Sequence, residues 1–254
     1  MLLDPLKIPS REKLILAGLY LSKFGPAALK SLGFESFVEA FNVIGYALRA
    51  KPASIKTYRD EFDPLFPNGR KGWHKRPTRD YCLKVFDEYK SLDLEAFTSL
   101  VKSCVGFAKN GWNEVCDGED APDGESAFAK RFITGLAAEH YFESVQPSLA
   151  EFQGCTVENT TRLGCGYDFR LRTESREEFF AVEVKGLRDR TGNLSLTSKE
   201  HDMAIALTER FFLFVVKNFC EVPFHEIYQD PLSGKLAFTK KKRVTVQVSW
   251  LASV

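Results

Sequence analysis

Residues 179–186 read FFAVEVKG, and no other segment limits the possible folds of this chain as strongly. Aromatic and β-branched residues dominate it, as is typical of an interior strand. Side chains alternate between the two faces of a strand, so one face is entirely apolar and the other carries Glu183 and Lys185. Burying two charges costs several kcal/mol unless they are paired or bind something. The sequence therefore predicts a buried strand whose charged face belongs to a site.

The composition favours a cytoplasmic globular protein. The chain has 254 residues, enough for one large domain or two modest ones, and its 44% hydrophobic and 27% charged residues are typical of a soluble protein. The first residues do not resemble a signal peptide, and the apolar runs are too short to span a bilayer, so no membrane partner is expected. The net charge is only +1, so any affinity for nucleic acid must come from local patches.

The cysteines and histidines do not suggest a metal centre. Six cysteines contain no C-x-x-C pair, and four histidines are scattered, which favours reduced thiols and argues against a zinc site. No G-x-x-x-x-G-K-[ST] motif is present, so we expect no P-loop motor in this chain.

The order of elements predicts an all-α domain over 1–108, a linker over 109–125 rich in Gly, Asp and Asn, and a second domain over 126–254. Hydrophobic periodicity predicts helices in the first domain, with Ser10 as a cap of the first helix and Gly25 at its end. These helices cover 10–25, 35–50, 80–92 and 94–106, with an irregular stretch at 62–80. The second domain reads as helix, strands, helix, strands, an α/β sheet. Its predicted helices are 126–145 and 198–209, and its predicted strands are 155–163, 167–173, 179–186, 210–219 and 243–251.

Two further carboxylates can join the charged strand. Asp168 opens the preceding strand, and Glu139 lies on the preceding helix, so three acids and Lys185 can converge. Such oxygen ligands suit Mg²⁺, which polarises a phosphodiester and acidifies a bound water. A lysine beside the metal can orient that water or stabilise charge in the transition state. The competing interpretation is a strand-edge salt bridge between Glu183 and Lys185.

An acid followed by E-x-K in an apolar strand resembles the PD-(D/E)XK nuclease superfamily. More narrowly, residues 130–232, with the motifs GYDFRL, FFAVEVKG, LSLTSKEHDMAIA, FFLFVV and IYQDP, resemble the domain at the C-terminus of the plant protein NO VEIN, which recurs in bacterial restriction and phage-defence proteins. The resemblance implies a restriction-endonuclease-like mixed sheet flanked by helices, with Mg²⁺ as cofactor and Mn²⁺ as a substitute. It also implies the catalytic and metal-binding residues. These are Asp168, Glu183 and Glu139 as metal ligands, with Lys185 completing the catalytic set.

The chain departs from the family pattern at two positions. Ala138 replaces the glycine that usually precedes the helix carboxylate, and Tyr167 replaces the proline of the superfamily name. Nearby, Thr197 and Glu200 have the spacing of a capping box, so we interpret Glu200 as a cap. Its helix would still lie beside the site, where Lys199 or His201 can touch a phosphate.

A basic segment in the first domain suggests contact with DNA. Residues 51–79 contain eight Lys and Arg and three acids, with Trp73 among the basic residues, a pattern suited to phosphates and stacking. The helices around residue 51 resemble a helix-turn-helix that offers Lys56, Thr57 and Arg59 to a groove. The alternative is a solvated charged face. The residues predicted to contact DNA are Lys56, Arg59, Arg70, Lys71, Trp73, His74, Lys75, Arg76 and Arg79.

Together these features predict a metal-dependent endonuclease that cleaves DNA in a restriction or phage-defence system. Double-strand cleavage suggests a homodimer, and the lack of a motor suggests a separate ATPase or methyltransferase partner. The alternative functions are a nuclease fold that binds nucleic acid without cleaving it and a subunit recruited by a motor protein.

Overall fold

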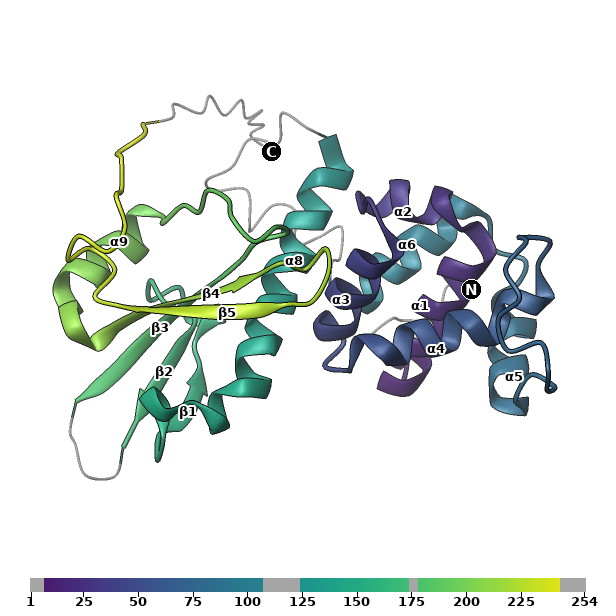
Figure 1. Ribbon diagram of the computed structural model, residues 1–254, viewed down its shortest axis with the longest axis horizontal. Coiled ribbons are helices and arrows are strands. Elements are labelled where there is room, and N and C mark those ends of the chain that lie inside the picture. The colour runs from purple at the N-terminus through teal and green to yellow at the C-terminus, as the bar shows by residue number, and fades with distance from the viewer. Residues whose placement is uncertain (1–6, 107–123, 174–177, 243–254) are drawn as a thin grey trace, which may run out of the picture.

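The computed structural model describes residues 7–106, 124–173 and 178–242. A helical part, formed by 7–106, lies beside a part built on a β-sheet, formed by 124–242 (Figure 1). Most of the predicted linker over 109–125 and the whole predicted strand over 243–251 lie outside the described residues. The domain boundary therefore stays a prediction.

The helical part follows the predicted order, with two differences. Pro9 precedes the first helix and Ser10 is its first residue, so the predicted cap at Ser10 is wrong by one position. Gly25 ends that helix with a φ of 54°, and Pro26, whose fixed φ suits a first turn, begins a short helix that periodicity did not reveal. The helices are α1 (Ser10–Phe24), α2 (Pro26–Leu32), α3 (Phe37–Ala47), α4 (Pro52–Phe62), α5 (Asp80–Tyr89) and α6 (Leu94–Cys104).

The sheet part is a mixed α/β layer, as predicted. Its strands lie in the order β1-β2-β3-β4-β5, and every neighbouring pair is antiparallel except β3 and β4. A parallel pair needs a crossover, which α9 provides. The elements are α8 (Gly124–Val145), β1 (Thr156–Asn159), β2 (Phe169–Arg172), β3 (Phe179–Gly186), α9 (Ser198–Leu207), β4 (Phe211–Lys217) and β5 (Phe224–Gln229). Short 3-10 turns occupy Asp63–Leu65, Gln146–Ser148, Ala150–Phe152, Thr161–Leu163 and Thr208–Arg210.

Helices cover both faces of β3, the central strand of the sheet. Val182 and Val184 pack in the main core together with Phe142 of α8. On the other face, Ala181 belongs to a smaller apolar cluster with Leu207 of α9. The salt bridge between Glu183 and Lys185 is present, at 2.6 Å, but β3 is an interior strand, so the pair does not lie on an edge strand of the sheet.

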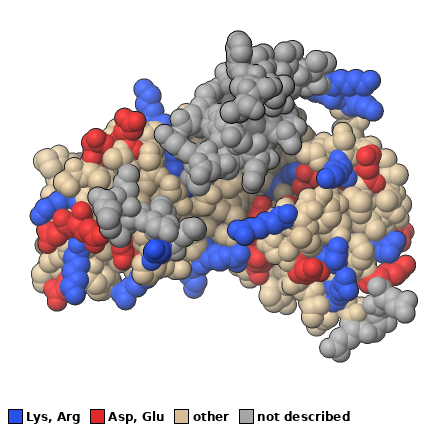
Figure 2. Space-filling model, turned by 180° about the vertical axis from the view of Figure 1, so that it is seen from behind, with Lys and Arg blue, Asp and Glu red and all other residues tan. Residues whose placement is uncertain are grey.

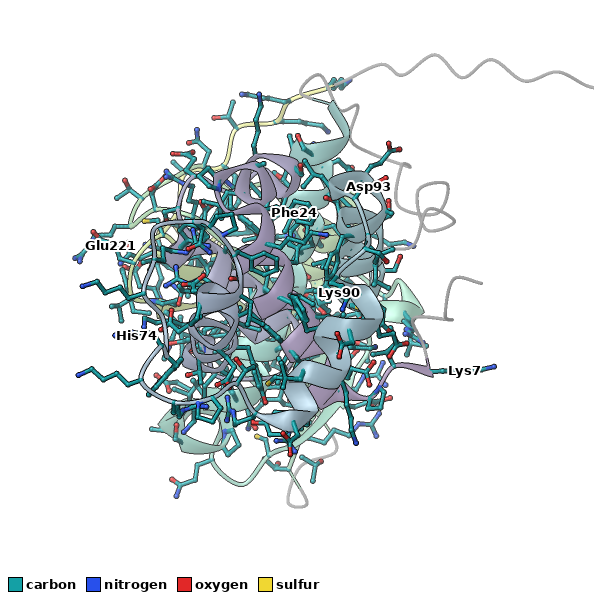
Figure 3. The ribbon with its side chains drawn as sticks, turned by 90° about the vertical axis from the view of Figure 1, so that its right-hand side faces the viewer. Lys7, Phe24, His74, Lys90, Asp93 and Glu221 are labelled. Atoms are coloured by element: carbon teal, nitrogen blue, oxygen red, sulfur yellow. The ribbon has the colours of Figure 1, made fainter. Side chains whose placement is uncertain are left out.

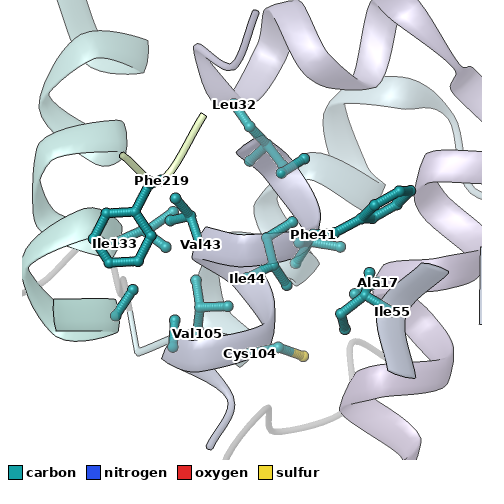
Figure 4. Close-up of a cluster of buried hydrophobic side chains, with 14 of the residues drawn as sticks. Ala17, Leu32, Phe41, Val43, Ile44, Ile55, Cys104, Val105, Ile133 and Phe219 are labelled. Atoms are coloured by element: carbon teal, nitrogen blue, oxygen red, sulfur yellow. The ribbon is translucent and has the colours of Figure 1, made fainter. Parts of the chain in front are cut away.

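The two parts share this core. Figure 4 shows Val43 of α3 packed near Ile133 of α8 and Phe219, which follows β4. The Asn42 side chain also donates hydrogen bonds across the junction, to the carbonyl of Phe219 at 2.8 Å and to that of Glu221 at 2.7 Å. Apolar packing and hydrogen bonds therefore both fix how the helical part docks.

A buried ion network crosses the same junction. The Glu39 side chain, on α3, is only 1% exposed. It forms an ion pair with Nζ of Lys130 on α8 at 2.8 Å and lies 3.4 Å from Nε of Arg188, just after β3. The Arg188 guanidinium also pairs with Glu35 at 2.6 Å, and that carboxylate is largely exposed.

The network generates a prediction for stability. Glu39→Ala leaves Lys130 and Arg188 without a buried counter-charge, so we expect it to lower the free energy of unfolding by about 3–5 kcal/mol. Glu35→Ala removes an exposed partner of the same arginine and should cost less than about 1 kcal/mol. Urea unfolding of both variants measures the difference. Equal, small losses would show that the network does not hold the two parts together.

Candidate active site

A pocket of about 500 Å³ lies between α8, the carboxyl end of β3 and the start of α9. It brings together the four residues predicted to be catalytic and one residue that was interpreted as a cap. These lining residues are Glu139, Asp168, Glu183, Lys185 and Glu200.

Two glycines let the flanking helices approach closely enough to form this pocket. A Cβ on Gly186, at the end of β3, would lie 3.0 Å from the carbonyl oxygen of Thr134 in α8. A Cβ on Gly166, which has a φ of 87°, would lie 2.8 Å from the carbonyl oxygen of Lys199 in α9. A side chain at Gly166 would force α9 to shift, and one at Gly186 would crowd α8, so both glycines favour the close approach of these helices.

Asp168 is held by the backbone of β3. Its N–H donates to the carbonyl of Val182 at 3.0 Å, and its Oδ2 accepts from the N–H of Val184 at 2.8 Å. Burial raises the pKa of Asp168 to about 6, although the hydrogen bond from Val184 and the charge of Lys185 oppose this shift.

Lys185 lies between two carboxylates. Its Nζ donates to Oε1 of Glu183 at 2.6 Å and to Oε2 of Glu200 at 2.8 Å. Burial lowers the pKa of Lys185, but the two carboxylates outweigh burial and leave the pKa above its usual value. The lysine is therefore held in its charged form, by acids from two different elements.

The pocket carries more negative charge than Lys185 offsets. Burial, and then repulsion from Asp168, raise the pKa of Glu183 well above its usual value despite its bond to Lys185. The pKa of Glu139 is raised to about 8, first by burial and then by repulsion from Asp168 and Glu143. Both shifts indicate that nearby positive charges and hydrogen bonds do not fully stabilise the ionised forms of these carboxyl groups.

Glu200 caps its helix, as interpreted, and also contacts Lys185. The capping box is present, because Oγ1 of Thr197 accepts from the N–H of Glu200 and Oε2 of Glu200 accepts from the N–H of Thr197 at 3.0 Å. The same Oε2 also accepts from Lys185. Sequence spacing predicts the cap. The contact with Lys185 could not be predicted in this way, because it depends on where the crossover helix α9 lies relative to β3.

Four arginines of the predicted DNA surface are paired with acids of α4 and the turn after it. Arg59 and Arg70 pair with Asp63, whose side chain is only 1% exposed. Arg76 and Arg79 pair with the fully buried side chain of Glu61, at 2.5 and 2.9 Å. On α4, Lys56 forms an i,i+4 pair with Asp60 at 2.6 Å. The pairs made by Arg59, Arg76 and Arg79 join the segment 62–80 to α4, whereas the pair made by Lys56 lies within the helix.

The remaining predicted contacts, Lys71, Trp73, His74 and Lys75, are exposed, with Trp73 at 46%. Figure 3 shows His74 projecting from the surface of the helical part. The segment lies beside α5, at the end of the helical part away from the sheet, so the structure does not bring it to the pocket (Figure 1). On the face in Figure 2, positive and negative side chains are interspersed over both parts.

Within the ranges that the structure describes, no group of three His, Cys, Asp or Glu residues is arranged to hold a metal ion. Any ion in the pocket would therefore depend on fewer protein ligands, completed by water or substrate.

The raised pKa values predict how stability depends on pH. The folded-state pKa of Asp168, about 6, and that of Glu139, about 8, exceed the ordinary values of 3.8 and 4.5. The folded protein therefore binds these protons more tightly, and their contribution to stability is present in acid and lost as pH rises through 6 and 8. In EDTA, the unfolding free energy should fall between pH 5 and pH 9, and fall less in Glu139→Gln. An identical fall in wild type and variant would exclude Glu139 as a cause.

The comparisons with known proteins concern the sheet part. A search of curated proteins and a search of solved structures found no match. No helix in the described ranges is long and apolar enough to cross a membrane. The assignment to the PD-(D/E)XK superfamily remains a prediction. Residues 137–228 match the family model described as "Protein NO VEIN, C-terminal", so this stretch of the chain is similar to that domain. The matched stretch contains Lys185 and the four acids of the pocket, Glu139, Asp168, Glu183 and Glu200.

Proposed function

We propose that the pocket is the active site of a metal-dependent nuclease that hydrolyses phosphodiester bonds in DNA. The observation that carries the proposal is the meeting of Asp168, Glu183 and Lys185 at one end of a pocket, where the carboxylates outnumber the lysine that pairs with them. Similarity to the NO VEIN C-terminal domain is consistent with a nuclease or defence role.

The donor set fits Mg²⁺. Burial and mutual repulsion disfavour the charged carboxylates, and a divalent cation would offset both effects. Mg²⁺ commonly uses one or two carboxylates and keeps several waters, so it does not need three preassembled protein ligands. Asp168 and Glu183 would hold the ion, with Glu139 as a further acid, and Mn²⁺ would substitute. The bound ion would supply Lewis-acid polarisation of the phosphate and a more acidic water.

Lys185 acts as a cation in this proposal. Its contacts with Glu183 and Glu200 favour the protonated amine, which suits it to orient an attacking water or to stabilise charge on the phosphate, and not to accept a proton. Asp168, fixed by the N–H of Val184, keeps its carboxylate at the end of β3 beside them.

The wider proposal concerns partners. DNA would be bound outside the pocket by the exposed residues Lys71, Trp73 and Lys75, whose cations and ring suit phosphates and stacking. Double-strand cleavage would need two copies, and a separate ATPase or methyltransferase would supply translocation or site marking. Binding without cleavage is the alternative outcome of the experiments below.

The first experiment tests metal-dependent cleavage. Purified protein should nick or cut DNA with Mg²⁺ or Mn²⁺ and stop in EDTA. Asp168→Asn should abolish cleavage but leave DNA affinity nearly unchanged, since it removes a metal ligand and no phosphate contact. Cleavage assays on DNA and RNA, with anisotropy for binding, measure both quantities. Cleavage that survives excess chelator would contradict the mechanism, and binding without cleavage in any metal would favour the alternative.

The second experiment tests Lys185 and its second partner. Lys185→Ala should lower the cleavage rate by on the order of 10²–10³, the usual cost of losing one preorganised electrostatic group. Glu200→Gln retains the capping box, which accepts Gln, but removes the charge facing Lys185, so we expect a smaller loss of rate with little change in stability.

Thr197→Ala is the matched control. It removes the cap at a cost of about 1 kcal/mol but keeps the pair between Lys185 and Glu200, so stability should fall while the rate is retained. If Glu200→Gln behaves like Thr197→Ala, the role of Glu200 is only structural. Full activity in Lys185→Ala would remove the catalytic role of the lysine.

A further inference from the structure

The pocket is acidic at one end and basic at the other. Its basic end is lined by Lys130 and Arg131 of α8 and by Arg188, which follows β3. The proposed chemistry at Asp168 and Glu183 does not use these cations, and they lie outside the basic segment that the sequence suggested for DNA.

One face of α8 joins the two ends. Arg131, Gly135 and Glu139 follow at intervals of four residues, so they lie on one stripe of the helix, and all three line the pocket. Eight residues of α-helix from Arg131 to Glu139 correspond to about 12 Å along its axis. A Cβ on Gly135 would have no neighbour within 4 Å, so the middle of this stripe borders open space.

The helical part holds Lys130 in position. Glu39 forms an ion pair with Lys130 at 2.8 Å and contacts Arg188, which also pairs with Glu35 at 2.6 Å and with Asp189 at 3.0 Å. The guanidinium of Arg188 is shared among three carboxylates, two of which belong to the helical part, so Arg188 links the two parts. Lys130 has one carboxylate partner among these, and its side chain is 20% exposed. The Arg131 side chain, on the next residue, is exposed.

We infer that Lys130 and Arg131 form a phosphate subsite, which binds the backbone of the substrate strand a few nucleotides from the bond that is cleaved. This inference rests on the proposed function. Phosphates of one strand follow at about 3.4 Å along the axis of a duplex, so a stripe of about 12 Å reaches from the acids to phosphates beyond the scissile one. Contacts of this kind position a strand without reading its sequence.

The test compares Arg131→Gln and Lys130→Gln with Lys84→Gln. Lys84 is an exposed residue of α5, at the far end of the helical part, and its substitution makes the same change of charge (Figure 1). Arg131→Gln and Lys130→Gln should raise KM several-fold with little change in kcat. In EDTA, the slope of log affinity against log salt should weaken by about one unit for each phosphate that the variant no longer neutralises. Lys84→Gln should change neither quantity.

A substrate scan locates the contact. Single neutral methylphosphonates placed at each of the flanking phosphates should weaken binding by wild type at one or two positions on one side of the cut. Arg131→Gln should be insensitive at one of those positions, because the variant has no cation there to pair with the phosphate. A merely structural change would not produce insensitivity at a single position. The test with Arg131→Gln also remains valid if Lys130→Gln unfolds because Glu39 keeps only Arg188 as a partner.

The outcomes separate the two proposals. If wild type cleaves DNA and Arg131→Gln matches Lys84→Gln in KM and in the scan, the subsite is wrong and the nuclease proposal stands. If wild type binds DNA without cleaving it, but Arg131→Gln has the weaker salt slope and is insensitive to methylphosphonate at one position, the subsite stands and the nuclease proposal fails. If wild type neither binds nor cleaves DNA or RNA, both are overturned.

Discussion

Burial of a charge pair in the central strand is the constraint on which the rest of the structure depends. Glu183 is 3% exposed, and Lys185 bonds to it from the same strand face. Neither charge is tolerable in an interior strand without partners from outside that strand. The fold supplies them by placing Glu200 of α9 against Lys185 and by letting α8 and α9 approach closely at Gly186 and Gly166. The pocket lies at the carboxyl end of β3, where residues of both helices line it together with Glu183 and Lys185.

Much of this arrangement can be predicted from local patterns, because alternation and periodicity report on single elements. Period-two alternation predicted β3 and its charged face. The order of the elements predicted that Glu139, on the preceding helix, and Asp168, at the start of the preceding strand, lie near that face. The structure places these residues around one pocket. Strand β5 was missed because all but one of its residues are partly buried, so its faces do not differ as alternation requires. The turn at Gly25 likewise concealed α2, since Gly followed by Pro marks the end of one helix and the start of another equally well.

Contacts between elements distant in the sequence could not be predicted in this way. Clustered arginines in the segment 62–80 suggest a DNA surface, but Glu61 and Asp63 are buried beside them and engage Arg70, Arg76 and Arg79, together with Arg59 of α4. Spacing does not distinguish an arginine that faces solvent from one that neutralises a buried acid. The same limit applies to the basic end of the pocket, where Lys130 and Arg188 meet Glu39 only because the helical part docks there.

Glu39 and Glu200 show how secondary structure can prepare a site. Each is the third residue of a helix, and each takes part in the hydrogen bonding that begins it: the N–H of Glu39 donates to Oγ of Ser36, and Glu200 completes a capping box with Thr197. A carboxylate in the first turn is favoured by the helix dipole, and the cap fixes its direction. Each carboxylate also holds a pocket lysine, Lys130 or Lys185. The same interactions that start α3 and α9 therefore orient cations at both ends of the pocket, so the position of these charges follows from folding and does not depend on a substrate to arrange them.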